Sequence, residues 1–216
     1  MYSWFCPPGG QVIDPFCGGS VRGIVASILG HPYWGCDLRP EQIAANQEQG
    51  QICGDEMPLW VTGDALDMLP AAPLADFIFT CPPYGDLEVY SDDPQDISTM
   101  DYPTFTATLA HIIALAGARL RNHRFAAIVV GDYRDKQGFY CNFVAETIAA
   151  FEAAGARLYN EAILVTALGS LPIRAGKQFA SGRKLGKTHQ NVLVFFKGDP
   201  DNIKGVFGEV QLGDIA

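Results

Sequence analysis

The sequence predicts an α/β fold in which a mostly parallel sheet carries helices on both faces. Apolar runs of strand length alternate with segments of helical period along the 216 residues. Such alternation buries both faces of a sheet, because each crossover returns a helix over it. The last two apolar runs have no clear helical pattern between them, which predicts an antiparallel strand at one edge. We expect a single domain over residues 1–216, with no structure assigned to a tail at 199–216.

The first half of the chain carries four strand patterns and two helix patterns. Strands are expected at 11–15, 33–37, 60–62 and 77–80, and helices at 21–29 and 41–49. Pro40 stands at the start of the second helix, where the missing N–H of proline is harmless. These segments supply the first four strands of the expected sheet.

The second half continues the alternation after a polar segment at 85–100, which we expect to be a loop. Asp101 can cap a helix that runs to about residue 120. Further strands are expected at 125–130, 162–167 and 191–197, with a helix at 142–154. The acidic side chains of the 85–100 loop would repel phosphates, so we expect this loop to act as a flap or to face away from a nucleic acid.

The charge balance is acidic overall but uneven along the chain. There are 24 Asp and Glu against 15 Lys and Arg, a net charge of -9. Residues 171–190 nevertheless hold no acidic residue and five basic ones, which are Arg174, Lys177, Arg183, Lys184 and Lys187. Two interpretations stay open for this basic window: a solvated, flexible loop, or a loop that contacts phosphates.

The remaining composition favours a cytoplasmic protein with no membrane partner. Hydrophobic residues make up 48% and charged residues 18% of the chain, which excludes disorder as its main state. Residues 1–10 lack the basic and apolar pattern of a signal peptide. The six cysteines form no Cys-x-x-Cys pair, which argues against a zinc ribbon and against a disulfide scaffold. We expect a reducing compartment and no metal site.

Three strand ends together suggest a nucleoside-binding rim, because ligands of open α/β sheets bind at the carboxyl ends of the strands. Asp14–Ser20 follows the first strand and carries Gly18-Gly19, which lets the backbone approach a ligand closely. Asp37 ends the second strand, where an acid binds ribose hydroxyls in dinucleotide folds, or else caps the helix at Pro40. Asp64 follows the third strand and either accepts from an exocyclic amine or closes a turn.

The fourth strand end is the most informative segment, and it reads Cys81-Pro82-Pro83-Tyr84. The two prolines fix an extended path and leave carbonyls free to accept hydrogen bonds. Tyr84 offers a flat face on which a planar base can stack. In the alternative interpretation, the prolines only end the strand and Tyr84 belongs to the core.

Two motifs in this order resemble those of the S-adenosylmethionine-dependent DNA amino-methyltransferases, which act on adenine N6 or cytosine N4. They are Asp14-Pro15-Phe16-Cys17-Gly18-Gly19 and Cys81-Pro82-Pro83-Tyr84. Further similarity lies at Phe5–Gly10, at Trp34–Asp37 and at His189–Lys197, so the resemblance covers nearly the whole chain. It implies a Rossmann-like, seven-stranded sheet with an antiparallel final hairpin.

The resemblance also implies S-adenosylmethionine as the cofactor and assigns residues to it. Asp14 would lie near its amino group, the glycine loop under its methionine part, Asp37 on the ribose, and Asp64 with Ala65 beside the adenine. The cofactor set implied is Asp14, Phe16, Cys17, Gly18, Gly19, Ser20, Asp37, Leu38, Asp64 and Ala65. The catalytic set implied is Cys81, Pro82, Pro83 and Tyr84.

Three departures from the family pattern accompany this assignment. Ser20 stands where the family usually has a further glycine, and Cys81 stands where it has Asp, Asn or Ser. Of the family helix that precedes Phe5, the chain holds only the last turn. We therefore expect either that the sequence is a fragment or that the cofactor site is more open than in the family.

Methyl transfer to the amino group of a base flipped out of DNA is the function that the resemblance implies, in a bacterial or phage-encoded protein. The five basic residues of the 171–190 window are then the expected DNA contacts. Three alternatives stay open: cytosine C5 methylation with Cys81 as nucleophile, RNA guanine N2-methylation, and an inactive nucleic-acid-binding relative. A homodimer or a separate specificity segment is expected to complete site recognition.

Overall fold

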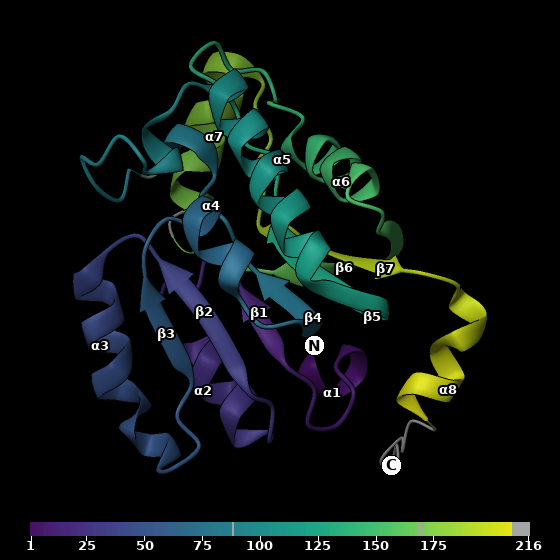
Figure 1. The fold of residues 1–216 in the computed structure, drawn as a ribbon. Coiled ribbons are helices and arrows are strands. Elements are labelled where there is room, and N and C mark those ends of the chain that lie inside the picture. Colours follow the sequence, from purple (N-terminus) through teal and green to yellow (C-terminus); the bar gives the residue numbers. More distant parts are fainter. Residues whose placement is uncertain (88, 168, 170, 209–216) are drawn as a thin grey trace, which may run out of the picture.

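A computed structural model describes residues 1–87, 89–167, 169 and 171–208 of the chain. Seven strands form one sheet in the order β3-β2-β1-β4-β5-β7-β6 (Figure 1). Their bounds are β1 Val12–Asp14, β2 Tyr33–Asp37, β3 Leu59–Thr62, β4 Ala75–Thr80, β5 Leu120–Val130, β6 Arg157–Val165 and β7 His189–Lys197. The predicted seven-stranded, mostly parallel sheet with a final antiparallel hairpin is confirmed.

Eight α-helices accompany the sheet in the described part of the chain. They are α1 Tyr2–Phe5, α2 Val21–Ile28, α3 Pro40–Gly50, α4 Ala65–Met68, α5 Tyr102–Arg119, α6 Phe143–Ala153, α7 Leu171–Gly182 and α8 Ile203–Phe207. The Asp101 carboxylate caps α5 by accepting a hydrogen bond from the Thr104 amide at 2.9 Å, as predicted. None of the helices within the described residues has the length and apolar character needed to cross a membrane.

Alternating side chains of the strands build two separate cores, one on each face of the sheet. Ile13 and Ile78 belong to the core under α4, α5 and α6. Their neighbours Val12 and Phe77 belong to the core under α1, α2, α3 and α8. This two-residue period is what a sheet covered on both faces requires. Helices on both faces, as predicted, are confirmed.

Two details of the C-terminal half differ from the prediction. The antiparallel strand β7 lies between β5 and β6, one place in from the edge, and β6 is the edge strand. The predicted absence of a helix between the last two strands is wrong, because α7 fills much of that segment. No residue of α7 is buried, and Gly176 and Gly182 lower the helix propensity of the segment, so the sequence signal for a helix is weak there.

The predicted tail at 199–216 contains a 3-10 turn and a short helix within its described residues. A short 3-10 turn at Pro200–Asn202 leads into α8, and Ile203 and Phe207 of that helix pack on the second core. Residues 209–216 lie outside the described residues. In Figure 1 the helix α8 sits at the amino-terminal end of the strands, far from their carboxyl ends.

Candidate active site

The glycine loop between β1 and α2 is held against the end of β2. The Cys17 amide donates to the Cys36 carbonyl at 3.0 Å. A Cβ at Gly35 would lie 2.7 Å from the Cys17 Cβ, so the close approach of loop and strand requires glycine there. Gly18 has a φ of +48°, a left-handed conformation that glycine adopts without strain. The loop backbone is thereby fixed at the carboxyl edge of the sheet.

Asp14 lies beneath this loop and is completely buried. Its carboxylate accepts hydrogen bonds from Tyr33 Oη at 2.8 Å, Thr80 Oγ1 at 2.6 Å and the Phe16 amide at 3.1 Å. Arg22 Nε lies 2.6 Å from the same carboxylate. The four partners come from β2, β4, the glycine loop and α2, so one buried charge joins the elements that shape the site.

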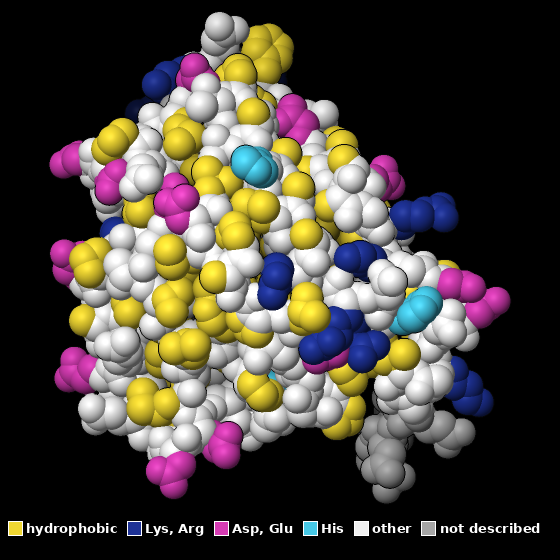
Figure 2. All heavy atoms as spheres, in the orientation of Figure 1, with side chains coloured by type: hydrophobic (Ala, Val, Ile, Leu, Met, Phe, Trp, Pro, Cys, Tyr) yellow, Lys and Arg dark blue, Asp and Glu magenta, His cyan; other side chains and the backbone are white. Residues whose placement is uncertain are grey.

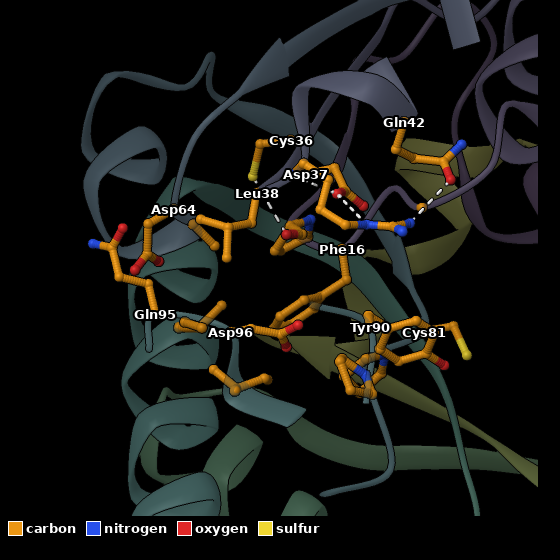
Figure 3. A pocket seen from close by; sticks show the side chains of 18 of the residues that line it. Phe16, Cys36, Asp37, Leu38, Gln42, Asp64, Cys81, Tyr90, Gln95 and Asp96 are labelled. Atoms are coloured by element: carbon orange, nitrogen blue, oxygen red, sulfur yellow. Dashed lines mark hydrogen bonds and ion pairs between the residues drawn. The ribbon is translucent and has the colours of Figure 1, made fainter. Parts of the chain in front are cut away.

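A cavity of about 370 Å³ opens at the carboxyl ends of the first four strands (Figure 3). Most of the predicted site residues line it, namely Phe16, Gly18, Gly19, Asp37, Leu38, Asp64, Ala65, Cys81, Pro82, Pro83 and Tyr84. Asp14, Cys17 and Ser20 are buried and are not among its lining residues. The structure thus brings the four strand ends together around one space and places Asp14 behind its wall.

Two aspartates stand at one end of this cavity. Asp37 Oδ1 accepts from the Arg39 amide at 2.9 Å, and Asp64 Oδ1 accepts from the Leu66 amide at 2.8 Å. Asp64 is therefore the N-cap of α4, a role that the sequence analysis did not consider for it. Burial raises the pKa of the Asp37 carboxyl. The positive charge of Arg39 and the hydrogen bond from the Arg39 amide act in the opposite direction and lower this pKa. In Figure 3 both side chains point toward the cavity beside Leu38.

The segment after Tyr84 contributes four residues to the wall of the cavity. Tyr90, Gln95, Asp96 and Ile97 line it, and Figure 3 labels the first three. Asp96 is buried, and its carboxylate accepts from the Ser98 amide at 2.9 Å and from Ser91 Oγ at 2.8 Å. Sequence reasoning missed these lining residues. Tyr90 and Ile97 are apolar side chains in an otherwise polar loop, and this was the one sign in the sequence that the loop contacts the rest of the protein. Glu88 lies outside the described residues.

Cys81 and Tyr84 form a corner at the other end of the cavity. Gln190 Nε2 donates to Tyr84 Oη at 2.8 Å, and the Tyr84 and Cys81 side chains lie near enough to influence each other's pKa. One edge of the Tyr84 ring packs against Phe143, with centroids 5.8 Å apart. The half-buried Tyr84 therefore contacts the core while lining the cavity, so both interpretations of this residue describe part of its position.

The Cys81 thiol should react slowly with alkylating reagents near neutral pH. Burial raises its pKa above the usual 9.0, while the nearby Arg22 guanidinium lowers it. A raised pKa leaves less thiolate at a given pH, so we expect the alkylation rate to climb steeply between about pH 7.5 and about pH 10. Iodoacetamide labelling followed by peptide mass spectrometry measures this rate. Labelling of Cys81 as fast at neutral pH as that of a free cysteine peptide would contradict the expectation.

The five basic residues of the 171–190 window differ in their surroundings, and Lys184 Nζ would lie 2.9 Å from a Cβ at Gly138. Arg174 and Lys177 are exposed on α7, and the Arg183 guanidinium lies over the Phe179 ring at 5.2 Å. Lys187 instead donates from Nζ to the Asp132 carbonyl at 3.0 Å, close to Gly131 and the Tyr84 ring. Figure 1 draws α7 at the carboxyl end of the sheet, the end that carries the cavity.

Two other basic residues form ion pairs with one aspartate, away from the cavity. Arg121 and Arg124 surround Asp76, with Nε to Oδ1 distances of 3.6 and 2.8 Å. Figure 2 shows Lys and Arg side chains gathered at this end of β5, while acidic side chains spread along the outline of the same face. Among the described residues, no three His, Cys, Asp or Glu side chains lie close enough to hold a metal ion.

Comparison with solved structures identifies the class of fold. TrmN from Thermus thermophilus matches with a TM-score of 0.54 and 18% identity over 88% of this chain, which spans only 45% of TrmN. Magnesium protoporphyrin IX methyltransferase (ChlM) from Synechocystis PCC 6803 with bound SAH matches with a TM-score of 0.58 and 11% identity, over 88% of this chain and 74% of that one. A putative rRNA-methylase from Clostridium thermocellum matches with a TM-score of 0.56 and 14% identity, over 90% of this chain and 92% of that one.

The chain therefore has the Rossmann-like fold of the S-adenosylmethionine-dependent methyltransferases. No protein-family model and no curated protein sequence matches it. The three neighbours described above are named as different proteins, and each is less than 20% identical in sequence to this chain. The comparison thus defines the fold alone, because one fold hosts many different chemistries.

Proposed function

We propose that the cavity binds S-adenosylmethionine and that the protein transfers its methyl group to an exocyclic amino group of a nucleobase in DNA. One observation carries this proposal: the Cys81–Tyr84 corner and the Asp37 and Asp64 rim line the same cavity. A nucleoside-containing cofactor and a planar substrate can therefore meet in one space. When bound, the cofactor supplies a methyl group on a sulfonium sulfur.

The residues at the rim fit the adenosine part of this cofactor. The Asp37 carboxylate offers oxygens to the ribose hydroxyls, as acids at this strand end do in dinucleotide folds. Leu38 and Ala65 offer apolar surface to the adenine, and Asp64 lies beside them as an acceptor for its amino group. Gly18 and Gly19 leave room for the chain that joins the nucleoside to the sulfur.

The corner residues hold the substrate amine. An amino group conjugated to a base ring is a poor nucleophile, because its lone pair is delocalised. The Pro82 carbonyl and the Cys81 sulfur can accept its two hydrogens and turn the lone pair toward the methyl group. Tyr84 stacks on the base, which leaves the duplex at a cost of a few kcal/mol. Transfer forms a carbon–nitrogen bond and breaks a carbon–sulfur bond, and the nitrogen then releases one proton.

Cys81→Ser distinguishes this route from cytosine C5 methylation. On the amine route serine is an equal or better acceptor, so we expect the turnover number to stay within about threefold of wild type. On the covalent route the sulfur must attack C6 of the ring, so the same change abolishes activity. The raised pKa of Cys81 favours the amine route, because the thiol is held in its less nucleophilic form. Tritium transfer from labelled S-adenosylmethionine to duplex DNA measures the rates.

The exposed cations of α7 are proposed to contact DNA phosphates. The double change Arg174→Ala with Lys177→Ala should weaken binding and make the slope of log K against log salt shallower by about 1.8, since each phosphate contact contributes about 0.9. Lys204→Ala is the matched control, because Lys204 is exposed on α8 at the opposite end of the sheet. Fluorescence anisotropy at several salt concentrations measures the slope. An unchanged slope in the double variant would refute the assignment.

A further inference from the structure

Arg22 lines the cavity at the end where the glycine loop meets Cys81, yet the sequence motifs give no role to this residue. It belongs to the first turn of α2, directly after the loop. Its side chain is 24% exposed, although its ion-pair partner Asp14 is completely buried. A guanidinium therefore stands between the buried carboxylate and the cavity.

The contacts of Arg22 fix its orientation and leave part of the guanidinium available. Nε pairs with Asp14 Oδ2 at 2.6 Å, while Nη2 donates to the carbonyls of Phe16 and Cys17 at 2.5 and 3.1 Å. Among the described residues, Nη1 has no hydrogen-bond acceptor in the protein. Because a guanidinium has five N–H groups in a rigid plane, its unused edge can bind a carboxylate.

Asp14 itself is poorly placed to receive a ligand. Three hydrogen bonds and the ion pair with Arg22 already occupy its oxygens, and it does not line the cavity. The resemblance implied that this carboxylate lies near the amino group of the cofactor. In the structure, the charged group that faces the cavity beside the glycine loop is instead a cation.

We propose that Arg22 binds the carboxylate of the amino-acid part of S-adenosylmethionine. The proposal rests on the cofactor assignment made above and adds a determinant of ligand selectivity, namely a preference for nucleoside thioethers and sulfonium compounds that carry a carboxylate. Arg39, a second arginine at the cavity, stands at the Asp37 end, where its Nε lies 3.8 Å from that carboxylate. Arg22 is thus placed to contact the amino-acid end of the ligand, and Arg39 lies at the ribose end.

Calorimetric titration with two ligands tests this assignment. S-adenosylhomocysteine carries the amino-acid carboxylate, and 5′-methylthioadenosine lacks the whole amino-acid part. We expect Arg22→Gln to weaken S-adenosylhomocysteine binding by at least about tenfold and to leave 5′-methylthioadenosine binding within about twofold. Retained binding of the second ligand also shows that the variant is folded. Arg39→Gln is the matched control, and it should not distinguish between the two ligands.

The possible results separate the failure of this inference from the failure of the cofactor assignment. If wild-type protein binds both ligands and Arg22→Gln weakens both equally, or neither, Arg22 does not read the carboxylate and the inference is overturned. If wild-type protein binds neither ligand, the cofactor assignment itself is wrong, and the inference falls with it. Decarboxylated S-adenosylmethionine gives a second readout. Wild type should bind it more weakly than S-adenosylmethionine, and Arg22→Gln should lose that discrimination.

Discussion

Tyr84→Ala is expected to lower kcat/KM for methyl transfer to DNA by about 10- to 100-fold, because stacking of a base on an aromatic ring contributes about 1–3 kcal/mol. The ring lines the cavity beside Cys81, and its hydroxyl is held by Gln190. Removal of the ring takes away the surface on which an extruded base would rest. Initial rates with duplex DNA at saturating S-adenosylmethionine measure the loss.

Tyr84→Phe separates stacking from the hydroxyl contacts. This variant keeps the ring and its packing on Phe143, but it loses the hydrogen bond from Gln190. If stacking is the main role, activity should stay within about threefold of wild type. A loss as large as that of Tyr84→Ala would contradict the stacking role and assign the effect to the hydroxyl. Calorimetry with S-adenosylhomocysteine verifies that each variant remains folded.

Asp14→Ala is expected to lower the free energy of unfolding by about 3–5 kcal/mol, since removal of one partner of a buried ion pair leaves the other charge uncompensated. Arg22 would lose its ion pair, and the hydroxyls of Tyr33 and Thr80 would lose their acceptor inside the protein. Urea denaturation followed by circular dichroism measures the change. We expect a lower midpoint with little change in the slope.

Two further variants serve as controls for the stability loss expected in Asp14→Ala. Asp92→Ala removes an exposed acid from the same protein and should alter the free energy of unfolding by less than about 0.5 kcal/mol. Asp14→Asn keeps the shape and one acceptor oxygen, so its loss should lie between those of the other two variants. A loss below about 1 kcal/mol in Asp14→Ala would mean that the buried network does not hold the strand ends together.

Much of the fold could be predicted because both faces of the sheet are covered. Strands such as β2 and β4 are short, continuous apolar runs, and helices such as α5 begin at a capping aspartate and are easily recognised. The four strand ends that carry the candidate site were placed correctly for the same reason. Their convergence follows from parallel strands that end at one edge of a sheet.

The features that sequence reasoning missed depend on contacts between distant segments. The burial of Asp14 depends on Tyr33 and Thr80, which stand 19 and 66 residues further along the chain. Arg22 is held at the cavity by that buried carboxylate and by the carbonyls of Phe16 and Cys17. The helix α7 contains Gly176 and Gly182, which lower helix propensity, and none of its side chains is buried in the core. These are tertiary effects, which local patterns do not contain.

Identification of the methylated nucleoside shows whether the protein methylates DNA on an amino group. The purified protein is incubated with duplex DNA and S-adenosylmethionine carrying a deuterated methyl group, and the DNA is digested to nucleosides for mass spectrometry. We expect deuterated methyl on the amino group of adenine or cytosine, as N6-methyladenine or N4-methylcytosine. Label in 5-methylcytosine, label only in structured RNA supplied in parallel, or no label in any nucleoside would contradict this expectation.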